Sequence, residues 1–314
     1  MKNTMAKTAF IFPGQDSQQV GMGRDLYDNF PAARDVFQKA GDVLDMDIAL
    51  LCFAGPEGEL KKTVNAQPAI MTVSVACLAV MGERGLGAEV VAGHSLGEYT
   101  ALVAAGSLAF EDAVRIVRAR GRYMQEAVPL GEGGMVAVMG LNAGAVQEVC
   151  AGISGREGVV EAVNLNSPGQ VVIAGDNSAL ERAVEALARR GARKCITLSV
   201  SAPFHSSLMR SAGERLGADL AAIAVKDPAL PVSWDRAGYK GSPGKPGVQP
   251  GALGRVCAED DWRWCGYLCR GRAGKGSFRA GQENRQGCKG YERGRRLFTG
   301  KSPCQLQGGW LKCI

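Results

Sequence analysis

The sequence of 314 residues predicts an α/β fold in which a small domain is inserted into a larger one. Thr8 to Phe12 is a short apolar strand, and the apolar run Ala88 to Ala92 leads through a glycine-rich turn into a helical pattern. From residue 134 the order changes to strand, helix, strand, strand, helix, strand, which is the order of a ferredoxin-like unit. A chain of this length has room for both domains.

Four helices of the larger domain are predicted by apolar residues spaced three and four apart. They are Ala32 to Leu44, Pro68 to Met81, Glu98 to Ala105 and Phe110 to Glu126. The apolar run at 68–81 falls short of the roughly 20 residues that cross a membrane, so we expect a buried helix and no membrane association. The arginines of 110–126 are of the kind that usually sits on a solvated face.

The small domain is expected to span residues 132–200, and the larger domain residues 6–131 and 201–231. The elements of the small domain are Met135 to Met139, Asn142 to Ala151, Val159 to Asn164, Gln170 to Ala174, Ser178 to Arg190 and Cys195 to Val200. The first, third, fourth and sixth are strands, and the others are helices.

Composition excludes several classes of protein. With 46% apolar and 22% charged residues the chain is globular rather than fibrous or wholly disordered. No apolar leader precedes Thr8, so we expect a cytoplasmic protein. The ten cysteines fit neither a zinc site nor, in that compartment, a disulfide framework, and no metal is expected.

Residues 232–314 differ in composition from the rest. They hold 16 of the 37 Lys and Arg but 6 of the 31 Asp and Glu, together with all four Trp and six Cys. Leu, Ile, Val and Phe make up 11 of these 83 residues, below the roughly 20% under which a charged segment tends to stay disordered. The charges follow no helical or strand period, which argues against a nucleic-acid-binding arm. We expect this basic tail to be poorly ordered.

The turn Gly93-His94-Ser95-Leu96-Gly97 matches G-x-S-x-G, the pattern of a nucleophile elbow. Small residues on either side permit a strained strand-to-helix turn that exposes the serine oxygen, and here a strand precedes and a helix follows. A glycine-rich turn with an incidental serine is the alternative. The elbow predicts an α/β-hydrolase-like larger domain with a parallel sheet and Ser95 as its nucleophile.

A serine hydroxyl becomes a good nucleophile when a neighbouring base accepts its proton. The chain has two histidines, and His94 lies beside Ser95 within the elbow, where adjacent side chains diverge. We therefore expect His205, in Pro203-Phe204-His205, to be the base.

Five motifs together resemble the malonyl-CoA:acyl carrier protein transacylase family, in family order across residues 6–231. They are Phe12-Pro13-Gly14-Gln15, Gly93-His94-Ser95-Leu96-Gly97-Glu98-Tyr99, Arg120-Gly121-Arg122, Asn166-Ser167-Pro168-Gly169-Gln170 and Pro203-Phe204-His205. The resemblance implies that Ser95 attacks malonyl-CoA while His205 takes its proton. The phosphopantetheine thiol of acyl carrier protein then accepts the malonyl group.

The resemblance also implies roles for the surrounding residues. Backbone N–H groups of Gln15 and Leu96 would hold the oxyanion, such donors being worth about 3 to 4 kcal/mol each. Arg120 would bind the malonyl carboxylate, since its planar fork donates two parallel hydrogen bonds. Gln67, His94 and Phe204 would line the pocket, with Phe204 disfavouring an α-methyl branch; for Gln67 a plain polar residue at a helix start is the alternative. No tightly bound cofactor, no nucleic acid and a monomer are expected.

Two features depart from the family. Asp16 stands where the family loop has its second glycine, which brings an acid close to the oxyanion and a Cβ into a turn that favours glycine. After Pro231, neither the family's closing strand with its Val-Gly-Pro-Gly loop nor the carbonyl that orients the histidine is found.

A shifted reading frame explains the second departure. With synonymous codons read one base along, the twelve residues from Cys265 become Val-Asp-Thr-Phe-Val-Glu-Val-Gly-Pro-Gly-Lys-Val, which is the missing family segment. The sequence leaves two alternatives to a transacylase open: an esterase of the α/β-hydrolase type, and an inactive remnant that binds carrier protein.

Overall fold

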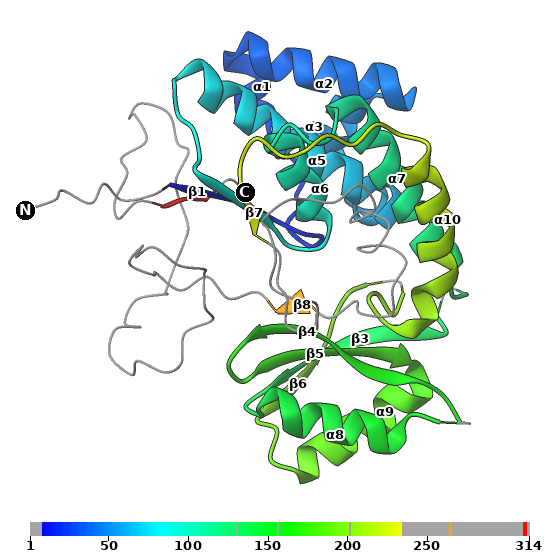
Figure 1. Ribbon diagram of the computed structural model, residues 1–314. Helices are drawn as coiled ribbons and strands as arrows, with labels where there is room; N and C mark the ends of the chain where they lie inside the picture. The colour runs from blue at the N-terminus through cyan, green and yellow to red at the C-terminus, as the bar shows by residue number, and fades with distance from the viewer. Residues whose placement is uncertain are drawn as a thin grey trace, which may run out of the picture.

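The computed structural model describes residues 8–129, 131–155, 157–200, 202–233, 264–265 and 310–312. A larger, mainly helical part is built on a parallel sheet, and a smaller part on a mostly antiparallel sheet (Figure 1). This confirms the predicted fold class. The expected domain boundaries lie beside residues 130 and 201, outside the described residues, and remain a prediction.

The parallel sheet has the strand order β7-β2-β1-β9. Its strands are β1 (Ala9–Phe12), β2 (Val90–Gly93), β7 (Val232–Ser233) and β9 (Trp310–Lys312), all paired in parallel. Both β7 and β9 belong to residues 232–314, so this segment contributes two short strands to the sheet. Apart from β7, β9 and the two residues of β8 (Trp264–Cys265), the tail lies outside the described residues, so its predicted disorder is not tested.

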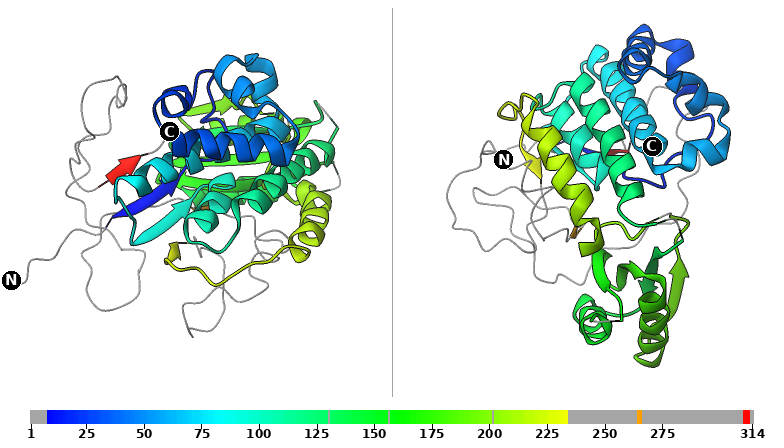
Figure 2. Two further views of the ribbon diagram at one scale, coloured as in Figure 1. Left: turned by 90° about the horizontal axis from the view of Figure 1, so that it is seen from above. Right: turned by 90° about the vertical axis from the view of Figure 1, so that its right-hand side faces the viewer.

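The helices of the larger part surround this sheet and lie against one another (Figure 2). The four that the sequence predicted are α2 (Pro31–Leu44), α5 (Thr63–Glu83), α6 (Leu96–Ala104) and α7 (Phe110–Glu126). Three others are α1 (Arg24–Asn29), α3 (Ile48–Ala54) and α4 (Glu57–Lys61). With five to seven residues each, they are too short to show an apolar period, and for this reason the sequence analysis missed them.

Helix α5 is the core of the larger part. Ala69, Met71 and Ala76 are fully buried, in agreement with the predicted buried helix. By length and composition α5 could cross a membrane, but 72% of its most apolar window is buried inside the protein, as in the core helix of a globular fold. It begins at Thr63, five residues before the predicted start, because Pro68 lies inside the helix instead of opening it.

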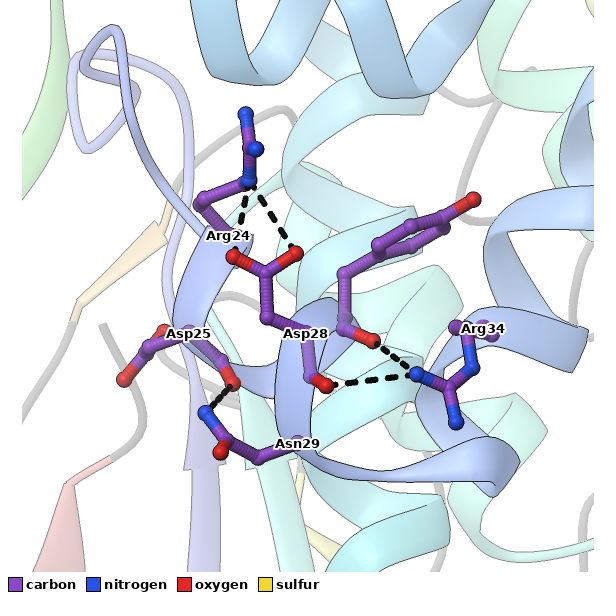
Figure 3. Close-up of polar contacts among 6 residues, drawn as sticks. Arg24, Asp25, Asp28, Asn29 and Arg34 are labelled. Atoms are coloured by element: carbon purple, nitrogen blue, oxygen red, sulfur yellow. Dashed lines mark hydrogen bonds and ion pairs between the residues drawn. The ribbon is translucent and has the colours of Figure 1, made fainter.

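The junction of α1 and α2 is closed by polar side chains (Figure 3). Arg34 donates to the main-chain carbonyls of Tyr27 and Asp28, both at 3.2 Å, near the C-terminal end of α1. Arg24 forms an ion pair with Asp28 at 2.9 Å one turn along the same helix. Carbonyls that a short helix leaves without intrahelical donors are thereby satisfied.

The small sheet has the order β6-β3-β5-β4-β8, in which the first four strands give the ferredoxin-like arrangement. Its elements are β3 (Gly133–Met139), α8 (Ala143–Ile153), β4 (Val160–Ser167), β5 (Gln170–Asp176), α9 (Asn177–Arg189) and β6 (Lys194–Thr197). Val136 and Val138 pack toward α8 and α9, whereas Met135 and Ala137 join the core of the larger part. The sheet is therefore sandwiched between its own helices and the larger part (Figure 1).

The chain returns to the larger part through η1 (Ser207–Met209) and α10 (Arg210–Ala221), which packs along α7 (Figure 2). The Tyr123 hydroxyl donates to Asp219 at 2.7 Å, and the Arg215 guanidinium lies 3.9 Å from the centre of the Tyr123 ring. These contacts fix the segment that follows His205 against the helix that carries Arg120.

Candidate active site

The elbow between β2 and α6 has the strained geometry that its sequence predicts. Ser95 has φ 53° and ψ −104°, a backbone conformation that costs about 1 to 3 kcal/mol in a residue with a side chain. A Cβ on Gly93 would lie 1.9 Å from the Gly97 carbonyl carbon, and one on Gly97 would lie 2.3 Å from the Phe12 carbonyl oxygen. Both positions therefore require glycine, as the strained strand-to-helix turn predicted from the sequence does.

The structure brings Ser95 and His205 together across 110 residues of chain. Ser95 Oγ and His205 Nε2 are 2.9 Å apart. His205 itself has a left-handed backbone, with φ 64°, so the loop that carries it is held in an unfavourable conformation by its surroundings. One of these is the small domain, where the Glu161 carboxylate on β4 accepts from the Ser207 N–H at 2.7 Å.

Arg120 is buried, with 3% of its surface exposed, and its guanidinium reaches the nucleophile. Nη2 donates to Ser95 Oγ at 3.0 Å and Nη1 donates to Gln67 Oε1 at 2.9 Å. The guanidinium also lies 5.7 Å from the centre of the Tyr99 ring, a cation–π contact. Arg115 and Arg122 on the same helix are more than half exposed, so the predicted solvated face holds for them and not for Arg120.

Close packing of α7 on α5 places Arg120 beside Gln67. A Cβ on Gly121 would lie 2.6 Å from the Thr63 carbonyl oxygen, so only glycine allows this approach. Gln67 is 1% exposed and directs its Nε2 to Met124 Sδ at 3.6 Å, which leaves its oxygen for Arg120. A polar residue buried in this way is not a plain helix-start residue.

The proposed oxyanion donors lie on the two segments that meet at the elbow. Leu96 is the first residue of α6, so its N–H is one that an α-helix leaves without an intrahelical acceptor. The loop of Gln15 packs against His94: a Cβ on Gly14 would lie 2.6 Å from His94 Nδ1. The Gln15 side chain is held by Thr63, with Nε2 3.2 Å from Oγ1.

Asp16 takes the left-handed conformation that the sequence analysis anticipated as strained, with φ 74°. Its side chain is exposed, and its N–H donates to Gln18 Oε1 at 2.9 Å. Partial burial raises the pKa of the Asp16 carboxyl, and the nearby Lys61 ammonium opposes this shift.

Burial dominates the electrostatics of the two histidines. It lowers the pKa of His205 to about 3, with further lowering by the Arg120 and His94 charges. Burial and then Arg120 also lower the pKa of His94. His205 is therefore neutral at pH 7 and has a lone pair for the Ser95 proton, which a base requires.

Phe204 is 5% exposed and belongs to the main hydrophobic core. The sequence analysis missed Tyr99, Thr63, Met124 and Glu161, which hold the functional side chains in place. Tyr99 lies within a quoted motif, whereas the other three carry no sequence signal. Among the residues that the structure describes, no group of three or more His, Cys, Asp or Glu could hold a metal ion.

A serine with a strained backbone, within hydrogen-bond distance of a histidine and a buried arginine, is an arrangement found in enzymes that transfer acyl groups through a covalent serine. The family model of the acyl transferase domain matches residues 9–239, and the chain belongs to this family.

Three relatives place the chain within the family. Malonyl CoA-acyl carrier protein transacylase of Bacillus subtilis is 48% identical over 228 residues, 73% of this chain and 72% of the relative. The crystal structure of the acyl-carrier-protein S-malonyltransferase from Burkholderia pseudomallei has a TM-score of 0.70 at 48% identity, covering 72% of this chain and 74% of that one. A malonyl-transacylase solved in complex with its holo type II polyketide acyl-carrier protein has a TM-score of 0.70 at 44% identity, with the same coverage.

The glycines of the elbow provide a test of its geometry. We expect Gly97→Ala to displace the elbow and abolish Ser95 labelling by a fluorophosphonate, because the new Cβ would collide with the Phe12 carbonyl. Gly82→Ala is the matched control, since its Cβ would meet nothing within 4 Å. Labelling is measured by intact mass and folding by circular dichroism. Unchanged labelling of the Gly97 variant would show that the turn tolerates a side chain.

Proposed function

We propose that Ser95 carries the malonyl group as an ester between the two substrates, with His205 as the base. The chain is an [acyl-carrier-protein] S-malonyltransferase, which transfers malonyl from malonyl-CoA to acyl carrier protein for fatty-acid synthesis. One observation carries the assignment of residues: Ser95 Oγ lies within hydrogen-bond distance of both His205 and Arg120. Ser95 is thus next to both a base and a cation that can bind a carboxylate. This combination fits the transfer of an acyl group that ends in a carboxylate.

In the first half-reaction, Ser95 Oγ bonds to the thioester carbonyl carbon and its proton passes to His205 Nε2. N–H groups of Leu96 and Gln15 hold the oxyanion that develops on the carbonyl oxygen. The intermediate collapses with loss of the C–S bond, and the coenzyme A sulfur leaves with the proton from His205. Arg120 binds the malonyl carboxylate, and Gln67 fixes the guanidinium for that contact.

The second half-reaction runs the same steps with the phosphopantetheine thiol of acyl carrier protein. The relative that was solved with its carrier protein supports this partner. All groups used are side chains and backbone of one chain, so the mechanism needs no tightly bound cofactor. We propose that a monomer carries out the reaction. His94 and Phe204 are proposed to line the pocket, with Phe204 disfavouring an α-methyl branch. The proposed location is the cytoplasm, where malonyl-CoA and carrier protein meet.

The buried Arg120 weighs against an esterase. Burying a charge is costly unless the charge is paired. A neutral ester substrate has no carboxylate with which the guanidinium could pair. The inactive remnant is disfavoured because the contacts among Ser95, His205, Arg120 and Gln67 are all formed.

Ser95→Ala should abolish covalent malonylation, because the nucleophile is removed while the pocket remains. Intact-mass measurement after incubation with malonyl-CoA should show an adduct in the parent and in Ser107→Ala, a buried serine of no catalytic role, but not in the Ser95 variant. An equal adduct in Ser95→Ala would assign the nucleophile elsewhere.

Arg120→Ala should reduce acylation by malonyl-CoA far more than acylation by acetyl-CoA, since only malonyl presents a carboxylate. The lost charge-assisted contact should cost on the order of 2 to 3 kcal/mol in kcat/KM for malonyl-CoA. Arg122→Ala, on the exposed side of α7, is the control. Equal losses with the two substrates would make Arg120 a structural residue.

We also propose that the reading frame changes after about Pro231. The family match ends at residue 239, and the Bacillus subtilis match covers 72% of that relative. The resemblance implies that a carbonyl in the following segment orients the histidine, and losing the orienting group of a serine-protease triad costs about 10⁴-fold. Restoring the frame should therefore raise the malonyl transfer rate. Equal rates for the two versions would mean that residues 232–314 replace the family segment fully.

A further inference from the structure

The Arg120 guanidinium is shared between recognition and the nucleophile. It is buried, Nη1 is held by Gln67 and Nη2 donates to Ser95 Oγ, the atom that must attack the thioester. A residue that served only to bind the substrate carboxylate would need no hydrogen bond to the nucleophile. Through this contact, binding of the substrate carboxylate also affects the Ser95 hydroxyl, if the chain has the function proposed above.

One donor of the guanidinium has no partner within the part of the chain that the structure describes. The N–H of Arg120 Nε is buried and donates to no acceptor there. Nε and Nη2 lie on the same edge of the planar group, where they present parallel N–H bonds that match the two oxygens of a carboxylate. A carboxylate bound at this edge satisfies Nε and competes directly with Ser95 Oγ for Nη2.

We propose that Arg120 couples substrate recognition to activation of the nucleophile: it restrains the Ser95 hydroxyl until the carboxylate of the acyl group takes over the guanidinium. Ser95 is then left to His205. Its Oγ lone pair, no longer engaged by Arg120, is directed to the thioester carbon as the proton moves to His205 Nε2.

The same exchange changes the strength of the base. The charged and titratable groups that face His205 are Arg120 from α7, His94 from the elbow and, through the Ser207 N–H, Glu161 from β4. After burial, the Arg120 charge is the largest cause of the lowered pKa of His205. A bound carboxylate offsets that charge and raises the pKa of His205 toward the operating pH, where a general base is most effective.

A neutral acyl group leaves both restraints in place. Acetyl-CoA brings no carboxylate, so the guanidinium stays on Ser95 and the pKa of His205 stays low. The coupling therefore predicts that the preference for malonyl over acetyl is expressed in the rate of acylation at saturating substrate, and not only in substrate affinity.

Gln67→Glu tests the coupling by gain of function. Gln67 Oε1 already accepts from Arg120 Nη1 at 2.9 Å, so the variant places a fixed carboxylate beside the guanidinium, where it offsets the charge that lowers the pKa of His205 without occupying the Nε and Nη2 edge. We expect Ser95 of this variant to react about tenfold faster than the parent with acetyl-CoA and with a neutral fluorophosphonate, and more slowly with malonyl-CoA. Gln67→Met removes the Nη1 contact without adding a charge, and it should react more slowly than Gln67→Glu with both neutral reagents. An unaccelerated Gln67→Glu, or equal acceleration in Gln67→Met, would overturn the proposal.

The unaltered chain provides a second test that does not depend on folding of a variant. In single-turnover acylation, the rate falls as pH drops through the pKa of His205 in the complex. Since the carboxylate raises that pKa, the fall should occur at higher pH with malonyl-CoA than with acetyl-CoA. Coincident profiles would contradict the coupling.

Nuclear magnetic resonance separates the coupling from the proposed function. The chain has two histidines, so a ring C–H signal is assigned by its loss in His205→Gln. In Arg120→Met, removal of the positive charge should move the titration of His205 to higher pH; an unmoved titration overturns the proposal. Neither this measurement nor fluorophosphonate labelling uses malonyl-CoA. A chain that forms no malonyl adduct but shows both effects would reject the proposed function and retain the coupling.

Discussion

The close approach of β1, β2 and α6 at the elbow is the constraint on which the site depends. Gly93 and Gly97 touch each other and the Phe12 carbonyl so closely that neither position has space for a Cβ. The strain at Ser95 is offset by this packing, and Leu96 follows directly as the first residue of α6. The loop after β1, with Gln15, is brought to the elbow by the same parallel pairing of β1 with β2.

A buried positive charge is the second organising element. Arg120 is buried, and the hydrogen bonds that it donates to Gln67 and Ser95, together with the Tyr99 ring, compensate for its lost hydration. The positive charge of Arg120 also acts on the base, since it contributes to the low pKa of His205. Arg120, Ser95 and His205 are thus linked by direct contacts, and the charge of Arg120 acts on the pKa of His205.

The small domain supports these three residues from outside. It lies in sequence between Arg120 and His205, and one face of its sheet joins the core of the larger part through Met135 and Ala137. Glu161 holds the turn after His205, and α10 then locks onto α7 through Tyr123 and Asp219. The segment that follows His205 is therefore held by contacts with both the small domain and the larger part.

The sequence by itself determined the features that depend on local backbone geometry. The G-x-S-x-G turn between a strand and a helix predicted the strained backbone at Ser95, because only small neighbours allow that turn. The apolar patterns predicted strands of both sheets and six helices, but not α10, although it is 12 residues long. Three to seven residues were too few to predict α1, α3, α4 or the return at η1. Partnerships across the chain were decided by tertiary structure: Ser95 with His205, Arg120 with Gln67 and Tyr99, and Ser207 with Glu161. Spacing along the chain says nothing about such contacts, since they form only where helices and sheets pack. No local pattern reports the burial at these places, which is the main cause of the low pKa of His205 and which encloses Arg120 beside Ser95.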